Sequence, residues 1–354
     1  MFVPGPVDVP PDVLQAQAQP MLPHRSKEYE EIHRRAAEKA QQVFYTRHRV
    51  FLFAATGTGI QEAAVRNFAN RHVLSCVNGA FAERWYEVAV TNGKEADKLE
   101  FPWDQPIDPQ RVADALRQKH YEVVTIVHNE TSTGMQNPVR EVAEVVRQLS
   151  PETILCVDAV SSLGGAKIEM DAWGIDLLFT SSQKCLALPP GLALAAVSDR
   201  ALEKAKQVEH RGWYFDFLRM EKHRLKDSTP ATPAMSLIFA LDYQLDRILN
   251  HEGLENRFAR HSRMAQRVQE WAETQGLQIF APPGYRSQTV TTIRNLQRWD
   301  VSALNAFLKA RGMRIANGYG ALKNITFRIA HMAETQPSDI EDLLQALEEF
   351  RRTL

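Results

Sequence analysis

The sequence predicts an α/β protein with a mostly parallel sheet sandwiched by helices and a smaller C-terminal α+β domain. Short apolar runs rich in β-branched residues alternate with helical stretches over the first two thirds of the chain. Strands with this composition, separated by helices, are typical of parallel sheets covered on both faces. After Leu241 the pattern changes to a long helical region followed by shorter elements. We therefore expect an arm at residues 1–13, a large domain at 14–250 and a small domain at 251–354.

The elements follow from local patterns taken in order. The arm is rich in proline, which excludes a long regular helix there. The apolar runs predict strands at residues 50–54, 73–77, 123–127, 154–157, 177–180 and 192–197. Helical periodicity predicts helices at residues 26–42, 60–68, 108–118 and 139–149. In the C-terminal part we expect a helical region at 243–276, strands at 289–293, near 314 and at 325–329, and helices at 301–311 and from 337.

The helix predicted at residues 108–118 has the clearest start signal. Asp108 is a residue type that caps helix N-termini, because its carboxylate accepts hydrogen bonds from free backbone N–H groups. Pro109 fits the first helical position, where a missing N–H costs nothing. The two residues together predict a helix that begins at position 109.

Composition limits the classes of function. Lys plus Arg number 42 and Asp plus Glu 43, a net charge of -1, so no overall positive field attracts nucleic acid or an anionic membrane. No apolar run is long enough to cross a bilayer, and the N-terminus does not resemble a secretory signal. The three cysteines are too few and too dispersed for a disulfide framework or a structural metal site. We expect a cytoplasmic protein with no metal, nucleic-acid or membrane partner.

Two glycines stand between a predicted strand and helix, in Ala55-Thr56-Gly57-Thr58-Gly59-Ile60. The free N–H groups of the helix that follows offer an anion site. The segment is a poor dinucleotide fingerprint, because Glu62 replaces the third glycine. The segment is compatible with either a phosphate site or an ordinary strand-to-helix turn.

Asp158 ends a predicted buried strand. It could cap the next element or lie beneath a ligand at the carboxyl ends of the strands. An unpaired carboxylate is costly to bury, so we expect a cationic partner.

Lys184 closely follows the next predicted strand, one strand–helix–strand step beyond Asp158. It could be a surface residue, or an amine whose pKa is lowered by burial so that it attacks a carbonyl. An anion site, a buried carboxylate and a lysine at one sheet edge together match the requirements of pyridoxal phosphate.

Seven segments in family-like order carry a resemblance over nearly the whole chain. They are Pro4-Gly5-Pro6, Thr56-Gly57-Thr58-Gly59, Asn78-Gly79-Ala80-Phe81, residues 128–134 (HNETSTG), residues 157–165 (VDAVSSLGG), Ser182-Gln183-Lys184 with Pro189-Pro190-Gly191, and Phe327-Arg328-Ile329. The chain resembles the class V aminotransferases of the fold-type I pyridoxal-phosphate enzymes, of the alanine–glyoxylate and serine–pyruvate type. The resemblance implies that fold and that cofactor.

The resemblance also implies roles for individual residues. Lys184 would form the Schiff base with the cofactor, and Asp158 would meet the pyridine nitrogen. The residues that would hold the phosphate are Thr58, Gly59, Gln183 and the backbone of Ile60. Phe81 would stack on the ring, with less area than the larger aromatic of many relatives, and Thr131 would hydrogen-bond the ring hydroxyl.

Substrate and partner contacts follow from the same resemblance. Gly5 and Arg328 would bind the substrate, since a guanidinium suits a carboxylate. Arg328 alone could equally be a surface cross-strand residue. A homodimer with shared active sites is implied, in which Thr232, or alternatively Thr229, reaches the partner's phosphate. Thr–Pro pairs are also ordinary helix starts.

Several residues near these segments carry no firm role. We expect His128 to be structural and Cys185 to be a packing residue. His24 and Arg25 either line the substrate entrance or are solvated. A second cation for an acidic substrate would have to be Arg25 or Arg286.

The expected activity is amino-group transfer from serine, alanine or aspartate to a 2-oxo acid such as glyoxylate or pyruvate, with ping-pong kinetics. A lyase on the same fold is an alternative. A desulfurase is disfavoured because no cysteine follows Cys185. A catalytically silent subunit is the third hypothesis, and intact Lys184, Asp158 and Arg328 argue against it.

Overall fold

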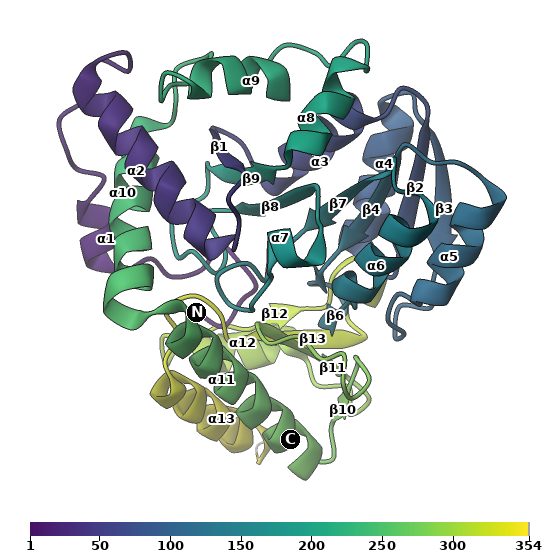
Figure 1. The fold of residues 1–354 in the computed structure, drawn as a ribbon. Helices are drawn as coiled ribbons and strands as arrows, with labels where there is room; N and C mark the ends of the chain where they lie inside the picture. Colours follow the sequence, from purple (N-terminus) through teal and green to yellow (C-terminus); the bar gives the residue numbers. More distant parts are fainter. Residues whose placement is uncertain (353–354) are drawn as a thin grey trace.

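A seven-stranded sheet organises the larger part of the molecule (Figure 1). The computed structural model describes residues 1–352. Neighbouring strands are parallel except β9, which is antiparallel to both β1 and β8. The strands lie in the order β1 (Arg49–Phe53), β9 (Ala193–Val197), β8 (Leu177–Ser181), β7 (Ile154–Asp158), β4 (Val123–Val127), β2 (His72–Val77) and β3 (Glu95–Glu100).

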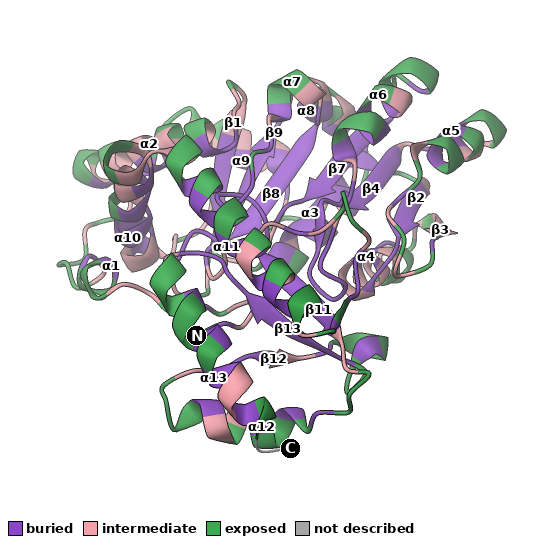
Figure 2. Cartoon of the chain, turned by 90° about the horizontal axis from the view of Figure 1, so that it is seen from below, coloured by how far each residue is buried: buried purple, intermediate pink, exposed green. Residues whose placement is uncertain are grey.

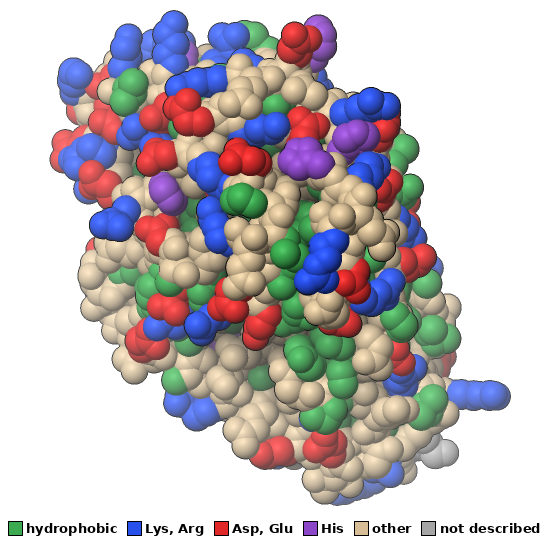
Figure 3. All heavy atoms as spheres, turned by 45° about the vertical axis from the view of Figure 1, so that its right-hand side comes forward, with side chains coloured by type: hydrophobic (Ala, Val, Ile, Leu, Met, Phe, Trp, Pro, Cys, Tyr) green, Lys and Arg blue, Asp and Glu red, His purple; other side chains and the backbone are tan. Residues whose placement is uncertain are grey.

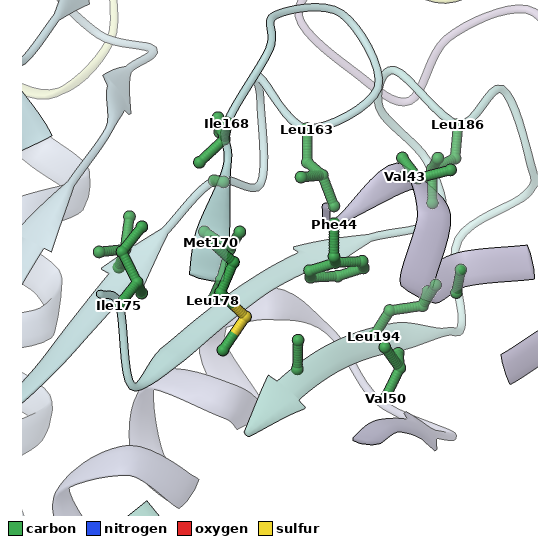
Figure 4. Close-up of a cluster of buried hydrophobic side chains, with 14 of the residues drawn as sticks. Val43, Phe44, Val50, Leu163, Ile168, Met170, Ile175, Leu178, Leu186 and Leu194 are labelled. Atoms are coloured by element: carbon green, nitrogen blue, oxygen red, sulfur yellow. The ribbon is translucent and has the colours of Figure 1, made fainter. Parts of the chain in front are cut away.

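Helices cover both faces of this sheet, and two separate cores result. Side-chain alternation explains the division: along β1, Val50 and Leu52 join one core whereas Phe51 and Phe53 join the other. The first core, part of which Figure 4 shows, involves α2 (Lys27–Val43), α5 (Pro109–Gln118), α6 (Val139–Leu149), α7 (Met170–Trp173) and α10 (Met235–Asp246). The second core involves α3 (Gly57–Phe68), α4 (Ala80–Thr91), α8 (Asp199–Lys206) and α9 (Phe217–Arg224).

The start signal of α5 is confirmed. The Asp108 carboxylate accepts a 2.9 Å hydrogen bond from the Gln110 backbone N–H, and Pro109 is the first helical residue. Burial follows the predicted sandwich, with the central strands buried and the outer helix faces exposed (Figure 2).

A second, antiparallel sheet forms in the C-terminal part. Its strands are ordered β10 (Gln278–Ile279), β11 (Val290–Arg294), β13 (Thr326–Ala330) and β12 (Ala316–Asn317). Phe327 and Ile329 face a third core, which they share with three helices. These helices are α11 (Leu254–Thr274), α12 (Val301–Lys309) and α13 (Pro337–Arg351). Since Arg328 alternates with Phe327 and Ile329, it points to the opposite face of the sheet.

The helical region predicted at 243–276 is interrupted. A π-helical segment, η1 (Arg247–Glu252), follows α10, and α11 starts only after Gly253. Gly253 has φ +79°, a conformation that ends a helix and that glycine adopts easily. The remaining short elements are α1 (Pro11–Gln15), β5 (Asn129–Glu130), β6 (Met135–Gln136) and η2 (Gly320–Leu322).

The surface carries charges of both signs. On the face in Figure 3, basic and acidic side chains are intermingled. Across residues 1–352, no helix combines the length and the hydropathy that a membrane crossing requires. The same residues contain no cluster of three or more His, Cys, Asp or Glu side chains arranged to hold a metal ion.

Candidate active site

A cavity lies at the carboxyl ends of three neighbouring parallel strands, β4, β7 and β8. Its volume is about 130 Å³, and Val127, Asp158 and Ser181 line it at these strand ends. Ligands of open α/β sheets bind at such strand ends. The other lining residues come mainly from the starts of α3 and α4 and the segment after β8: Thr56, Gly57, Thr58, Gln61, Phe81, Arg84, Asn129, Thr131, Val160, Gln183 and Lys184.

Asp158 is buried and held by two neutral donors. Gln61 Nε2 donates to its Oδ2 at 2.9 Å, and the Val160 backbone N–H donates to its Oδ1 at 2.8 Å. Burial raises the pKa of Asp158 to about 6, against the opposing effect of these hydrogen bonds. The expectation of a cationic partner is not met within residues 1–352, where no Lys, Arg or His side chain forms an ion pair with Asp158. The charge of Lys184 lowers the pKa of Asp158 without direct contact, so this carboxylate is available to pair with a cationic group of a ligand.

Lys184 lies beside the N-terminal arm. Its Nζ donates a hydrogen bond to the Pro4 carbonyl oxygen. Gly5 allows this approach, because a Cβ there would lie 2.5 Å from Lys184 Cδ, and its φ of +87° also favours glycine. Burial, and secondly the charge of Arg328, lower the pKa of Lys184 to about 8. An amine with this pKa is partly unprotonated near neutral pH and can act as nucleophile or base.

Four residues that line the cavity have a buried polar side-chain atom without a hydrogen-bond partner in the described chain. These atoms are Gln61 Oε1, Asn129 Oδ1, Ser181 Oγ and Gln183 Oε1. An unsatisfied buried polar group is costly, and such groups are rare in native proteins. Their concentration around one cavity indicates a site made for a polar ligand.

The start of α3, where the sequence is compatible with an anion site, lies at the cavity. Thr56, Gly57 and Thr58 line the cavity at the helix N-terminus, where backbone N–H groups lack helical partners. Gly57 is required here, because a Cβ would lie 2.5 Å from Val160 Cγ2. Gly59 packs against Phe215 and Ile60 is fully buried, and neither is among the residues that line the cavity.

Phe81 enters the cavity from α4. Its ring stacks on Tyr319 with centroids 5.1 Å apart and planes at 9°. The Glu130 carboxylate accepts hydrogen bonds from the backbone N–H groups of Phe81 (3.1 Å) and Ala82 (3.0 Å), which caps the helix. This cap fixes the helix start that carries Phe81.

Arg328 is not among the residues that line the cavity, but it contacts Thr131, which does line it. The Thr131 hydroxyl donates to Ser161 Oγ at 2.8 Å. Arg328 donates from Nε to the Asn317 carbonyl at 3.0 Å and from Nη1 to the Thr131 carbonyl at 3.3 Å. Its guanidinium is buried, and burial lowers the pKa of Arg328 to about 10.

Other predicted residues lie elsewhere. Thr232 lines a different hollow, next to Tyr214, and is exposed. Arg286 forms an ion pair with Glu273 at 2.7 Å, so its charge is already neutralised. His24 and Arg25 are not among the residues that line the cavity. His128 Nδ1 hydrogen-bonds Ser162 Oγ at 2.8 Å and burial lowers the pKa of His128 to about 4, which fits a structural residue.

Several residues at the cavity were not predicted as site residues from the sequence: Gln61, Arg84, Asn129, Ser181 and the neighbouring Glu130 and Tyr319. Gln61 could have been found, because it lies one helical turn after Gly57 and so faces the same side of α3. Tyr319 could not, since it comes from a distant loop.

The model of the aminotransferase class-V family matches residues 12–338. The chain belongs to the class V aminotransferases. An uncharacterized aminotransferase of Methanocaldococcus jannaschii is 38% identical over 338 residues, 94% of this chain and 87% of the relative. The L-aspartate–glyoxylate aminotransferase of Paracoccus denitrificans is 34% identical over 340 residues, 94% of this chain and 86% of the relative.

A solved structure of an aminotransferase has the same fold as this chain. The aspartate aminotransferase of subgroup IV from Thermus thermophilus superposes with a TM-score of 0.91 at 30% identity, covering 98% of this chain and 97% of that one. This class V aminotransferase therefore has the fold-type I architecture, and its cofactor is pyridoxal phosphate.

The cavity fits that cofactor on three independent counts. The helix N-terminus of α3 suits the phosphate, the buried Asp158 carboxylate suits a protonated ring nitrogen, and Lys184 suits the aldehyde. The four unpartnered polar atoms supply further hydrogen-bonding capacity around the ring.

Proposed function

We propose that this aminotransferase moves the amino group of alanine, serine or aspartate to a 2-oxo acid such as glyoxylate or pyruvate, in two successive half-reactions. The observation that carries the proposal is that Lys184 and Asp158 line one cavity, after the adjacent strands β8 and β7. We further propose that it works in the cytoplasm, which rests on the sequence alone.

Lys184 and Asp158 have the chemical tasks in this proposal. When bound, pyridoxal phosphate supplies a ring that withdraws electrons from the substrate Cα. Lys184 would hold the cofactor through its Nζ, and its free amine would take the proton from the substrate Cα. Asp158 holds a proton at the ring nitrogen. A carboxyl group with a pKa of about 6 is ionised at pH 7, so Asp158 can accept that proton's hydrogen bond.

The remaining contacts orient the two molecules. Thr58 and Gln183 bind the phosphate, Phe81 stacks on the ring, and Thr131 faces its hydroxyl. Arg328 and Gly5 receive the substrate carboxylate. We retain backbone roles for Gly59 and Ile60 at the phosphate as part of the proposal.

The partner subunit completes the phosphate site in this proposal. Thr229 is buried and its hydroxyl donates to the Ala231 carbonyl at 2.6 Å, whereas Thr232 is exposed. Thr232 is therefore the better candidate to reach across a homodimer. The neighbouring aromatic residues Trp213 and Tyr214 are 52% and 42% exposed, which supports an interface beside this loop.

The test is a screen of amino donors with the cofactor-loaded enzyme, following the absorbance of the bound cofactor and the formation of pyridoxamine phosphate. We expect alanine, serine or aspartate to convert it, and Lys184→Ala to lose covalent attachment of the cofactor after borohydride reduction. Release of ammonia without pyridoxamine phosphate would favour a lyase. An enzyme whose absorbance no donor changes would be a silent subunit. Sedimentation tests the dimer.

A further inference from the structure

We propose that Arg84 selects amino donors that carry a second carboxylate, such as aspartate, by binding the side-chain carboxylate. The inference rests on the proposed function and specifies its substrate class. It assigns the second cation to a residue other than Arg25 and Arg286, the two that the sequence suggested.

The position of Arg84 is the first argument. It lies on α4 one turn after Phe81 and lines the same cavity as Asp158 and Lys184. Its Cζ is 5.0 Å from the centroid of the Phe81 ring. The guanidinium is therefore fixed next to the residue on which the cofactor is expected to stack.

Arg84 forms no ion pair with an acidic side chain in residues 1–352. Its Nη2 donates to the Tyr319 hydroxyl at 2.7 Å, which uses one of five donors. By contrast, Arg286 and Arg294 are paired with Glu273 and Asp104, respectively. Most of the hydrogen-bonding capacity of Arg84 is thus available to a ligand that enters the cavity.

Tyr319 places Arg84 and Arg328 on the same side of the site. Arg84 contacts its hydroxyl, and Arg328 Cζ lies 5.6 Å from the centroid of its ring. Tyr319 thus contacts both guanidinium groups, and two guanidiniums can receive the two carboxylates of one small molecule. Arg328 takes the α-carboxylate, as the proposed function states, and Arg84 takes the other.

Electrostatics favour the same class of donor. The charges of both Arg84 and Arg328 contribute to the lowered pKa of Lys184, so both guanidiniums lie near enough to act on the amine. A donor with one carboxylate compensates one of these charges. A donor with two compensates both, and it gains a second charge-assisted hydrogen bond.

The experiment measures the rate of the donor half-reaction against concentration for aspartate and alanine. We compare the wild type with Arg84→Gln, Arg84→Lys and the control Arg111→Gln, whose guanidinium stacks on Phe101 (Cζ 4.4 Å from the ring centroid) outside the site. We expect the aspartate-to-alanine specificity ratio to fall about 100-fold in Arg84→Gln, as expected for loss of a hydrogen bond between charged groups. Arg84→Lys should restore part of the ratio, and Arg111→Gln should leave it unchanged.

Three results would overturn the inference: an unchanged ratio in Arg84→Gln, a wild type that does not prefer aspartate, or a parallel loss for both donors with weaker cofactor binding. The last result would make Arg84 a cofactor ligand. The alanine reaction of the wild type separates this inference from the proposed function. If neither donor converts the wild type, the aminotransferase proposal itself fails, whereas conversion of alanine alone contradicts only the role of Arg84.

Discussion

The carboxyl group of Glu130 fills the space that a side chain at Gly79 would need: an ideal Cβ on Gly79 lies 2.3 Å from Glu130 Cγ. Gly79 is the residue before α4, and Glu130 caps that helix through two backbone N–H groups. Gly79 and Glu130 thus act together to fix the start of α4, and this start sets where Phe81 and Arg84 enter the cavity.

This relationship predicts coupling between the two positions. Gly79→Ala should destabilise the protein by about 2 kcal/mol, because an overpacked site must shift. In a Glu130→Ala background the same substitution should cost less, because the Glu130 side chain is gone and the remaining close contact is Ser132 Oγ, 2.8 Å from the ideal Cβ. Urea unfolding of the two single variants and the double variant measures the coupling. Strictly additive effects would contradict the packing described here.

Gln61 tunes Asp158. Its hydrogen bond stabilises the charged form of the carboxylate, so Gln61→Leu should raise the pKa of Asp158 from about 6 by about one unit. Carbon-13 NMR titration of the aspartate carboxyl groups in cofactor-free protein measures the shift. Gln183→Leu is the control, since Gln183 lines the same cavity without contacting Asp158. An equal shift in both variants would exclude a specific role for Gln61.

We expect the buried charge of Lys184 to lower the free energy of unfolding of the cofactor-free protein at neutral pH. Its pKa is lowered from 10.5 to about 8 by burial, so between these values the unfolded chain binds more protons and stability rises with pH. Lys184→Met should therefore be more stable than wild type at pH 7, by at most about 3 kcal/mol. The advantage should shrink between pH 8 and pH 10.5.

Urea unfolding across that pH range gives the test of the Lys184 prediction. Lys206→Met is the matched control, because Lys206 is exposed and pairs only locally with Glu203. An advantage of Lys184→Met that does not depend on pH would show that packing, rather than the amine's charge, is responsible.

Arg257 connects α11 to the segment that carries Lys184. It is fully buried and donates from Nη2 to the Cys185 carbonyl at 2.7 Å, from Nε to the Gly164 carbonyl at 2.9 Å, and from Nη1 to Glu252 at 2.6 Å. Arg257→Met should lower the free energy of unfolding by about 3 to 5 kcal/mol, since it leaves buried acceptors without a donor. Thermal unfolding measures the loss. Arg263→Met, on the exposed side of the same helix, should change little.

Periodicity and turn chemistry predicted much of the fold. The helix at Val139–Leu149 begins and ends at the predicted residues, and the strands of the large sheet other than β3 were found within about two residues. These elements bury one or both faces, so their hydrophobic pattern reports their structure. The strand Glu95–Glu100 was missed because it is an edge strand with four charged residues, which leaves no apolar run to detect.

The residues of the candidate site also fall into two groups, those whose position the strand pattern predicts and those that only tertiary packing brings together. Lys184, Asp158 and the turn at Gly57 follow strands, so topology alone brings them to one edge. Arg84 and Tyr319 meet only because the segment between β12 and η2 lies against the start of α4, and no local pattern encodes that contact. The antiparallel direction of β9 could not be predicted either, because the direction of a strand does not change its amino-acid composition.

The position of Pro4 matters for how the enzyme is handled. Its carbonyl accepts the hydrogen bond from the Lys184 amine, and Phe2 forms a bridge with Ile315. A purification tag joined ahead of Met1 would begin only a few residues before Pro4, whose carbonyl contacts the Lys184 amine, so kinetic work should place the tag elsewhere.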